Sequence, residues 1–251
     1  MAEKRRADQL LVEQGLAESR AKAQALILAG LVSFGGRRVD KPGEQLAADV
    51  PLALRGRDHP WVSRGGVKLA FALDHFRIAV EGHVALDIGA STGGFTDVVL
   101  SRGARRVYAV DVGHGQLAWK LRHDPRVVVY ERLNARHLTR AAIPEPIDIV
   151  TCDASFIGLS TVLPAPLVLA AEHAQLVALV KPQFEAGPAQ VGKGGVVRDP
   201  EVHRDVCERV VAWVGAQPGW SVVGIVESPI LGPEGNREFL LYACRGGERS
   251  Q

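Results

Sequence analysis

From residue 67 onward, short apolar segments alternate with segments whose apolar residues recur at helical spacing. The apolar segments are too continuous to leave one face in water, so each is expected to be a strand covered on both faces. Strands that alternate with helices form a mostly parallel sheet. We therefore predict an α/β, Rossmann-like sheet with helices on both faces. The expected strands are residues 84–88, 107–110, 127–130, 147–152, 176–180, 221–226 and 239–244, and the expected helices are 67–76, 95–101, 116–122 and 201–214, with a further helical stretch after residue 160.

The first part of the chain has a different pattern. Residues 7–29 contain two helical segments, and Ser19 is suited to cap the second one. Short β-like pieces with glycine- and proline-containing turns follow. The next stretch is polar and rich in chain breakers, which is typical of a linker. We therefore predict a small α+β domain at residues 1–54, a linker at 55–63 and a larger domain at 64–251.

The N-terminal segment is modestly basic. Residues 1–38 hold seven Lys or Arg and four Asp or Glu, whereas the whole chain has a net charge of only +2. Such a bias suits contact with nucleic acid, but it is equally typical of a solvated helix surface. The candidate RNA contacts in this segment are Arg5, Arg6, Arg20 and Lys22.

Several classes of protein are disfavoured. The three cysteines, Cys152, Cys207 and Cys244, are widely spaced and form no CxxC pair, so neither a zinc site nor structural disulfides are expected. The most apolar stretch, residues 163–180, is interrupted by prolines and polar residues, and no signal-peptide pattern follows Met1. We expect a cytoplasmic protein without a membrane partner or a bound metal. No feature predicts an oligomeric state.

A glycine-rich turn follows the first strand of the expected sheet. Residues 86–96 read LDIGASTGGFT, and their glycines allow a sharp turn and the close approach of a ligand. Ser91 stands where a dinucleotide-binding motif has its second glycine, and Asp87 would repel a pyrophosphate. S-adenosylmethionine carries an ammonium group and no phosphate, so it is compatible with this turn. The expected cofactor contacts here are Asp87, Gly89, Ser91, Gly93, Gly94 and Phe95.

Two polar residues follow the next strands. Asp111 ends the second strand, about twenty residues after the turn, where a carboxylate can accept hydrogen bonds from both hydroxyls of a ribose. Asn134 follows the third strand, where its amide could contact the edge of an adenine, although alone it is equally an ordinary turn residue. Together with the glycine-rich turn, these positions predict S-adenosylmethionine as the cofactor, with Asp153 as a further contact.

Lysines and carboxylates occur where later strands end. Asp153 and Lys181 each come directly after an expected strand, so both should lie at the same sheet edge as the glycine-rich turn. Methyl transfer to a hydroxyl needs a group that makes the alcohol easier to ionise, and a lysine held by a carboxylate can do this. Lys68 and Glu238 are expected to lie at the same opening, beside the edge of the sheet that carries the glycine-rich turn. Each residue alone could be a surface or capping residue, so the prediction depends on their joint pattern.

Six segments of the chain closely resemble the TlyA group, also called hemolysin A, of the FtsJ-like ribosomal RNA 2′-O-methyltransferases. They read SRGGVK, LDIGASTGGFT, CDASF, VKPQFE, VGKGGVVRDP and GNREF. The resemblance covers nearly the whole chain and implies a Lys-Asp-Lys-Glu catalytic set at Lys68, Asp153, Lys181 and Glu238, in which Lys181 activates the 2′-hydroxyl. It also implies transfer from S-adenosylmethionine to cytidine in ribosomal RNA within ribosomal subunits. The helix pair at residues 7–29 would belong to an RNA-binding module.

Further RNA contacts are expected outside the N-terminal segment, at Arg64, Lys193 and Arg198. The last two flank glycines, and their loop could grip phosphate or simply connect two elements. Phe156 is a candidate for stacking on a base, although a place in the core is the commoner alternative. Trp61 could stack on RNA or pack between the domains, and the sequence does not choose.

Methylation of a base is the nearest alternative. Enzymes that methylate amino groups need prolines after the polar residue that ends the fourth strand, and the segment after Asp153 has none. Carbon-5 methylation needs a cysteine nucleophile, but strand alternation directs Cys152 away from Asp153. A pore-forming hemolysin would need a membrane-active segment, and a non-catalytic ribosome-binding factor would not need the Lys-Asp-Lys-Glu set. Methylation of the RNA ribose therefore remains the preferred function.

Overall fold

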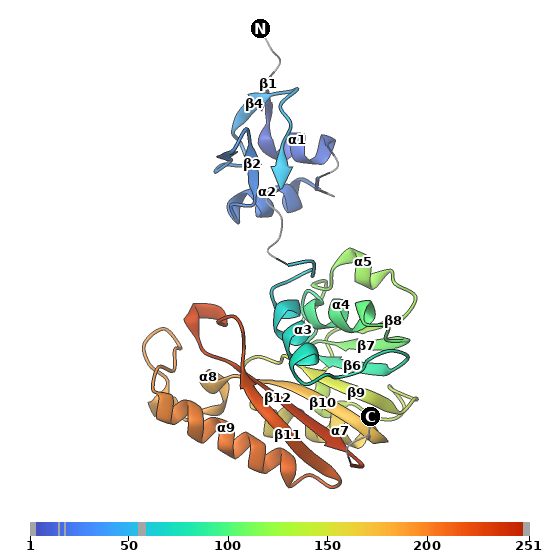
Figure 1. Ribbon diagram of the computed structural model, residues 1–251. Coiled ribbons are helices and arrows are strands. Elements are labelled where there is room, and N and C mark those ends of the chain that lie inside the picture. Colours follow the sequence, from blue (N-terminus) through green and yellow to red (C-terminus); the bar gives the residue numbers. More distant parts are fainter. Residues whose placement is uncertain (1–3, 15, 18, 55–58, 248–251) are drawn as a thin grey trace. The chain divides into compact units, whose positions relative to one another are not determined.

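A computed structural model of the protein describes residues 4–247 except 15, 18 and 55–58, so the first part of the predicted linker, 55–58, lies outside the described residues. The chain forms two compact units, residues 1–60 and residues 61–251 (Figure 1). Each unit has its own core of buried apolar residues.

The smaller unit packs two helices against short strands around a compact core that includes Leu10, Leu11 and Ile27. As predicted, Ser19 caps the second helix, because its side-chain oxygen accepts a hydrogen bond from the N–H of Lys22 at 3.2 Å. Strands β1 and β4 form an antiparallel pair. The other three strands form a second antiparallel sheet in the order β3-β2-β5. The elements are α1 (Ala7–Glu13), α2 (Arg20–Leu28), β1 (Lys4–Arg6), β2 (Val32–Phe34), β3 (Arg37–Arg38), β4 (Gln45–Ala47) and β5 (Ala53–Leu54).

Strand β1 is absent from the sequence prediction. Its three residues are all charged, so they show no apolar alternation that would mark a strand. They become a strand because β4, about forty residues later, supplies backbone partners, and the register places Arg5 opposite Leu46. Only the tertiary fold provides that partner.

The larger unit contains a seven-stranded sheet in the order β11-β12-β10-β9-β6-β7-β8. Strand β12 runs antiparallel to both of its neighbours, and the remaining neighbours are parallel. This mostly parallel sheet confirms the predicted fold class. The strands are β6 (Val84–Ile88), β7 (Arg106–Val110), β8 (Val127–Tyr130), β9 (Ile147–Cys152), β10 (Ala170–Val180), β11 (Trp220–Glu227) and β12 (Phe239–Arg245).

Helices cover both faces of this sheet (Figure 1). One face packs on α3, α4 and α5 around residues such as Leu69 and Val98, and the other packs on α6, α7 and α9 around Leu163 and Val206. The helices are α3 (Gly65–His75), α4 (Gly94–Ser101), α5 (Trp119–Arg122), α6 (Leu159–Val162), α7 (Pro164–Val168), α8 (Pro182–Glu185) and α9 (Pro200–Gly215). Among the described residues, no helix is both long enough and apolar enough to cross a membrane.

Two element predictions need correction. The helix expected at residues 116–122 is only the single turn α5, because the residues before it form a loop in which Gly115 has φ +69°. The strand expected at 176–180 begins six residues earlier, at Ala170. The first half of β10 is partly polar and lacks strand character in sequence, but the strand as a whole is paired with β12 from Ala174 onward.

Candidate active site

The glycine-rich turn joins β6 to α4 at the carboxyl edge of the parallel strands. Gly89 has φ +76°, and a Cβ on it would lie 2.9 Å from the backbone of Ala154. Gly93 has φ +96°, and its Cβ would lie 2.3 Å from the side chain of Leu121. The turn therefore needs glycine at both positions for conformation and for space.

Asp87 lies beneath this turn. Its side chain is fully buried and accepts hydrogen bonds from the hydroxyls of Thr96 at 2.6 Å and Thr151 at 3.0 Å. Burial raises the pKa of Asp87 to about 6, although the two hydroxyl groups oppose the shift. Two cavities lie beside the turn, and Asp87 lines neither of them. Asp87 therefore supports the turn from beneath and is not part of a cavity surface.

A cavity of about 720 Å³ opens beside the turn, and Asp111 and Asn134 both line it. The two carboxylate oxygens of Asp111 accept hydrogen bonds from the N–H groups of Ser91 at 2.8 Å and Gly113 at 2.6 Å. They hold the turn against the end of β7. A cavity of this size, with apolar walls and a few polar groups, is typical of cofactor sites.

Asn134 has a local role in this structure. Its side-chain oxygen accepts hydrogen bonds from the backbone N–H of Arg136 at 3.1 Å and from the Arg136 guanidinium at 3.3 Å. It thereby caps the short 3₁₀ helix η1 (Ala135–His137). The ordinary turn role that sequence left open is thus present, and Asn134 also lies on the cavity wall.

A second cavity, of about 410 Å³, adjoins the first. Both cavities are lined by Gly89, Ser91 and Asp153, so Asp153 stands where they meet. The smaller cavity is also lined by Arg64, Lys68, Gly94 and Phe95 and by the loop at residues 230–232. All the predicted cofactor residues except Asp87 and Gly93 line at least one of the two cavities.

Two lysine–carboxylate ion pairs lie at this edge of the sheet. Lys181 Nζ is 2.7 Å from Asp153 Oδ1, and it also donates to Ser155 Oγ at 2.8 Å. Lys68 Nζ is paired with Glu238 Oε2, and the Glu238 side chain is fully buried. Burying ion pairs costs desolvation energy, so two such pairs beside a cavity indicate a functional centre. The four residues predicted to act together are thus gathered as two pairs.

Phe156 is not a core residue, which corrects the commoner alternative. Its side chain is 90% exposed, and its φ of +63° is unusual for a bulky residue. Its ring lies 5.0 Å from the ring of Phe184, and Phe156 also lines the larger cavity. Lys181 Nζ lies 5.9 Å from the Phe184 ring centre, so the pair formed by the exposed Phe156 and the half-buried Phe184 borders the Lys181 ion pair.

The loop that carries Lys193 and Arg198 is tied to the segment before β12. Both side chains are exposed. Asn236, which the sequence did not single out, accepts a hydrogen bond from the N–H of Val197 at 3.1 Å and donates to the carbonyl of Gly195 at 3.0 Å. Asn236 therefore holds this loop in place, two residues before Glu238 in the chain.

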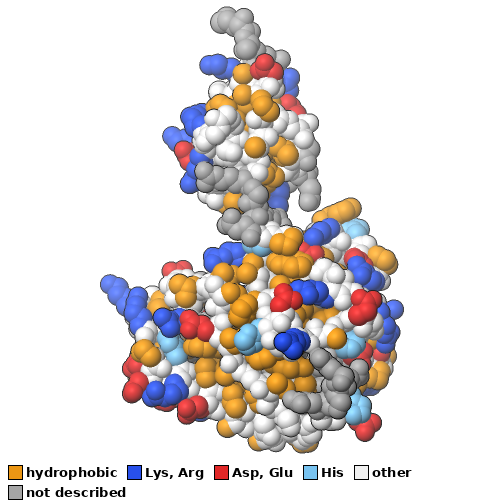
Figure 2. Space-filling view, viewed as in Figure 1, with side chains coloured by type: hydrophobic (Ala, Val, Ile, Leu, Met, Phe, Trp, Pro, Cys, Tyr) orange, Lys and Arg blue, Asp and Glu red, His pale blue; other side chains and the backbone are white. Residues whose placement is uncertain are grey.

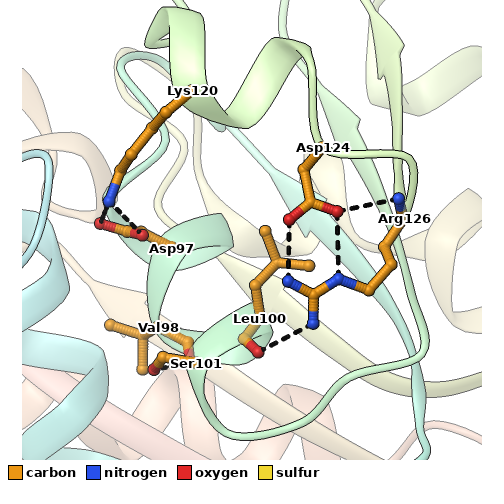
Figure 3. A network of polar contacts seen from close by, with 7 residues as sticks. All are labelled: Asp97, Val98, Leu100, Ser101, Lys120, Asp124 and Arg126. Carbon is orange, nitrogen blue, oxygen red and sulfur yellow. Dashed lines mark hydrogen bonds and ion pairs between the residues drawn. The ribbon is translucent and has the colours of Figure 1, made fainter.

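Asp97 is a second residue that the sequence did not reveal. Figure 3 shows Lys120 of α5 reaching Asp97 of α4, with distances of 2.8 and 3.0 Å to the two carboxylate oxygens. Asp97 also accepts a hydrogen bond from the N–H of Val62 at 2.8 Å. These bonds hold α5 over the turn. Asp97 was missed because it lies within an apolar helical segment and looks like an ordinary surface acid.

Trp61 packs within the larger unit. A Cβ on Gly66 would lie 2.4 Å from the Trp61 side chain, so the indole lies directly against α3. In the smaller unit, Arg5 pairs with Glu13, whereas Arg6 and Arg20 both reach Asp8. Lys22 is exposed.

Comparisons with known proteins identify both units. Residues 61–245 match the family model described as FtsJ-like methyltransferase, and residues 5–49 match the S4 domain. The chain is 51% identical over 244 residues to the 16S/23S rRNA (cytidine-2′-O)-methyltransferase TlyA of Mycobacterium tuberculosis, with coverage of 96% of this chain and 90% of that protein. Hemolysin A of Brachyspira hyodysenteriae is 39% identical, covering 94% of this chain and 98% of its own length. A solved structure of a suspected hemolysin from Streptococcus thermophilus has a TM-score of 0.75 and 46% identity, covering 98% of this chain and 90% of that one.

Proposed function

The chain belongs to the TlyA, or hemolysin A, family of FtsJ-like methyltransferases, and from this we propose that it methylates the 2′-hydroxyl of a cytidine in ribosomal RNA with S-adenosylmethionine. The observation that carries the proposal is the pairing of Lys181 with Asp153 and of Lys68 with Glu238 beside two adjoining cavities. The Lys68–Glu238 pair is buried and the Lys181–Asp153 pair is partly buried, and the desolvation energy that this costs favours a catalytic site over a binding protein without activity.

The larger cavity suits the adenosine part of S-adenosylmethionine. Asp111 presents carboxylate oxygens that can also accept hydrogen bonds from ribose hydroxyls, and Gly89 leaves space that a Cβ would fill. When bound, the cofactor supplies a methyl group activated on a positively charged sulfur. Asp153, on the cavity wall, and the buried carboxylate of Asp87 behind the turn would supply the negative charge that a positively charged cofactor needs.

The junction of the two cavities, where Asp153 lies with its partner Lys181, suits the ribose of the target nucleotide. Lys181 stabilises the negative charge that develops on the 2′-oxygen, and Asp153 and Ser155 hold the Lys181 amine in one position. Lys68, which lines the smaller cavity and is held by the buried Glu238, can orient the ribose. Arg64 is exposed at this mouth and suits a contact with a flanking phosphate. The exposed ring of Phe156 suits stacking on a base that has left its helix.

The smaller unit suits docking on folded RNA. It matches the S4 domain and presents Arg5, Arg6, Arg20 and Lys22, and Lys193 and Arg198 supply further positive charge in the larger unit. We assign these roles to a small domain at residues 1–54 and a catalytic domain at 64–251, joined by 55–63. The substrate of the protein would be RNA within ribosomal subunits, which agrees with the cytoplasmic location expected from the sequence.

The test is transfer of tritium from labelled S-adenosylmethionine to purified 30S and 50S subunits, each measured separately and followed by mass mapping. Label on the ribose of a cytidine supports the proposal and shows which subunit is the substrate. Label on a base would contradict the assigned chemistry. The absence of transfer to either subunit by a protein that binds the cofactor would contradict the assigned substrate.

A further inference from the structure

A fully buried acid lies among the basic residues of the smaller unit. Asp8, in the first turn of α1, has an exposed fraction of 0%. Its Oδ1 accepts a hydrogen bond from Arg6 Nε at 2.9 Å, and its Oδ2 accepts one from Arg6 Nη2 at 2.9 Å. Oδ2 also accepts from Gln24 Nε2 at 2.9 Å and from Arg20 Nη2 at 3.3 Å. One carboxylate therefore gathers side chains from β1 and α2.

The two arginines remain accessible although Asp8 holds them. Their side chains are 39% exposed for Arg6 and 54% exposed for Arg20, whereas the Asp8 side chain is 0% exposed. A guanidinium has five N–H donors, and the bonds to Asp8 use two on Arg6 and one on Arg20. Donors therefore remain that can bind a second group. Figure 2 shows basic side chains along one side of this unit.

The turn that follows β3 confines Arg6 further. A Cβ on Gly43 would lie 3.1 Å from Arg6 Nη1, so the chain at Gly43 lies directly against the guanidinium. The neighbouring backbone is tied to α1, because Asp8 donates its N–H to the carbonyl of Pro42 at 3.1 Å. Arg6 is thus held by a carboxylate and by a turn.

An acid at this place has two opposite effects on RNA binding. Its negative charge weakens the attraction of phosphate, since affinity for nucleic acid grows with the positive charge that meets the backbone. It also orders two long side chains that would otherwise lose rotamer entropy on binding. The hydrogen bonds from Arg6 hold the pKa of Asp8 well below its usual range, so the carboxylate stays ionised at neutral pH.

We propose that Asp8 is a positioning residue, which presents Arg6 and Arg20 as a preformed pair of guanidinium groups to the phosphate backbone of folded RNA. This inference rests on the proposed RNA substrate. It goes beyond the basic charge of the unit, because it assigns a favourable role in RNA binding to a negative charge. The trio has a net charge of +1, and its effect comes from geometry rather than from the amount of charge.

The test compares two equal changes of charge in the full-length protein. Asp8→Asn removes the buried acid, and Asp49→Asn removes an exposed acid of the same unit. Binding to the ribosomal subunit that accepts methyl label would be measured at several salt concentrations. We expect Asp8→Asn to weaken binding at least about fivefold and to reduce the salt dependence of log Kd by about one unit of slope. Asp49→Asn should leave binding unchanged or slightly tighter.

Tighter binding by Asp8→Asn would overturn the proposal, because it is the result that charge alone predicts. A second comparison tests the link between Asp8 and Arg20, and urea unfolding of each variant identifies any loss of binding that comes from unfolding of the unit. Arg20→Gln removes one arginine and leaves the bonds from Arg6 and Gln24 to Asp8 in place. If Asp8 acts through Arg20, the Arg20→Gln change should cost much less affinity in an Asp8→Asn background than in the natural protein. Additive losses would contradict the inference.

These outcomes are distinct from failure of the proposed function. If the natural protein neither binds nor methylates a ribosomal subunit, the assigned substrate is wrong, whatever Asp8 does. If the natural protein binds and methylates subunits and Asp8→Asn does the same with equal affinity and salt slope, only the role of Asp8 is wrong. Cofactor affinity, measured by calorimetry, should be the same in all variants because the cofactor cavity lies in the other unit.

Discussion

Lys181 and Asp153 meet at the ends of the neighbouring strands β10 and β9, with 2.7 Å between Nζ and Oδ1. Asp153 also lines both cavities, so this ion pair links the expected cofactor site with the expected nucleotide site. The relationship makes Lys181 the residue whose replacement should separate chemistry from binding.

Replacing Lys181 with alanine should lower methyl transfer at least about a thousandfold, since a preorganised charge at the reacting oxygen is lost. Cofactor affinity should stay within about threefold of the natural value, because Lys181 does not line the cofactor cavity. Single-turnover transfer and calorimetry would measure the two effects. Lys193→Ala, which removes an exposed lysine, is the matched control for catalysis and should keep turnover near normal at saturating RNA. Substantial turnover by Lys181→Ala would move the catalytic role elsewhere.

Replacing Glu238 with glutamine should destabilise the larger unit by about 3 kcal/mol or more, because it leaves the buried ammonium of Lys68 without its charged partner. Urea unfolding would measure the loss. The double variant Lys68→Met with Glu238→Gln should recover part of the stability but no activity, since it removes the unpaired charge. If the double variant is less stable than Glu238→Gln by the full cost of Lys68→Met alone, the two residues do not act as a pair.

The buried Asp87 should make stability depend on pH. Folding raises the pKa of Asp87 from 3.8 to about 6, so between these values the folded chain holds more protons than the unfolded chain. The free energy of unfolding should therefore fall as pH rises through this range, by a total of about 3 kcal/mol from this residue. Asp87→Asn removes the effect, so its stability relative to the natural protein should increase from pH 4 to pH 8. Parallel stability curves for the two proteins would show that Asp87 does not titrate in this way.

Replacing Gly93 with alanine should lower cofactor affinity by about tenfold or more, because the new Cβ would lie 2.3 Å from Leu121 at a φ of +96°. The turn would have to shift away from α5. Gly115→Ala is a matched control, since Gly115 also has a positive φ, +69°, but no atom lies within 4 Å of its Cβ position. Calorimetry with S-adenosylmethionine should show a clear difference between the two variants. Equal losses would mean that backbone strain, and not the contact with Leu121, limits the turn.

Part of the candidate site was accessible from the sequence because parallel strands place their carboxyl ends at one edge. Asp111, Asp153 and Lys181 each come directly after an apolar segment, so their common location follows from strand order and length. The glycine-rich turn was accessible for a similar reason, since backbone conformation at Gly89 and Gly93 depends mainly on local geometry.

Other features required the tertiary structure because they join residues that are distant in the chain. Lys68 and Glu238 are 170 positions apart, and only the packing of α3 near β12 makes them a buried pair. The sequence predicted Asp87 as a cofactor contact and did not single out Asp8, and the burial of both depends on the hydroxyls and guanidinium groups that the fold brings to them. Periodicity and strand order are local properties of the chain, so sequence determined the sheet and its active edge. Burial and pairing are properties of packing, so the tertiary structure alone decided which charges meet.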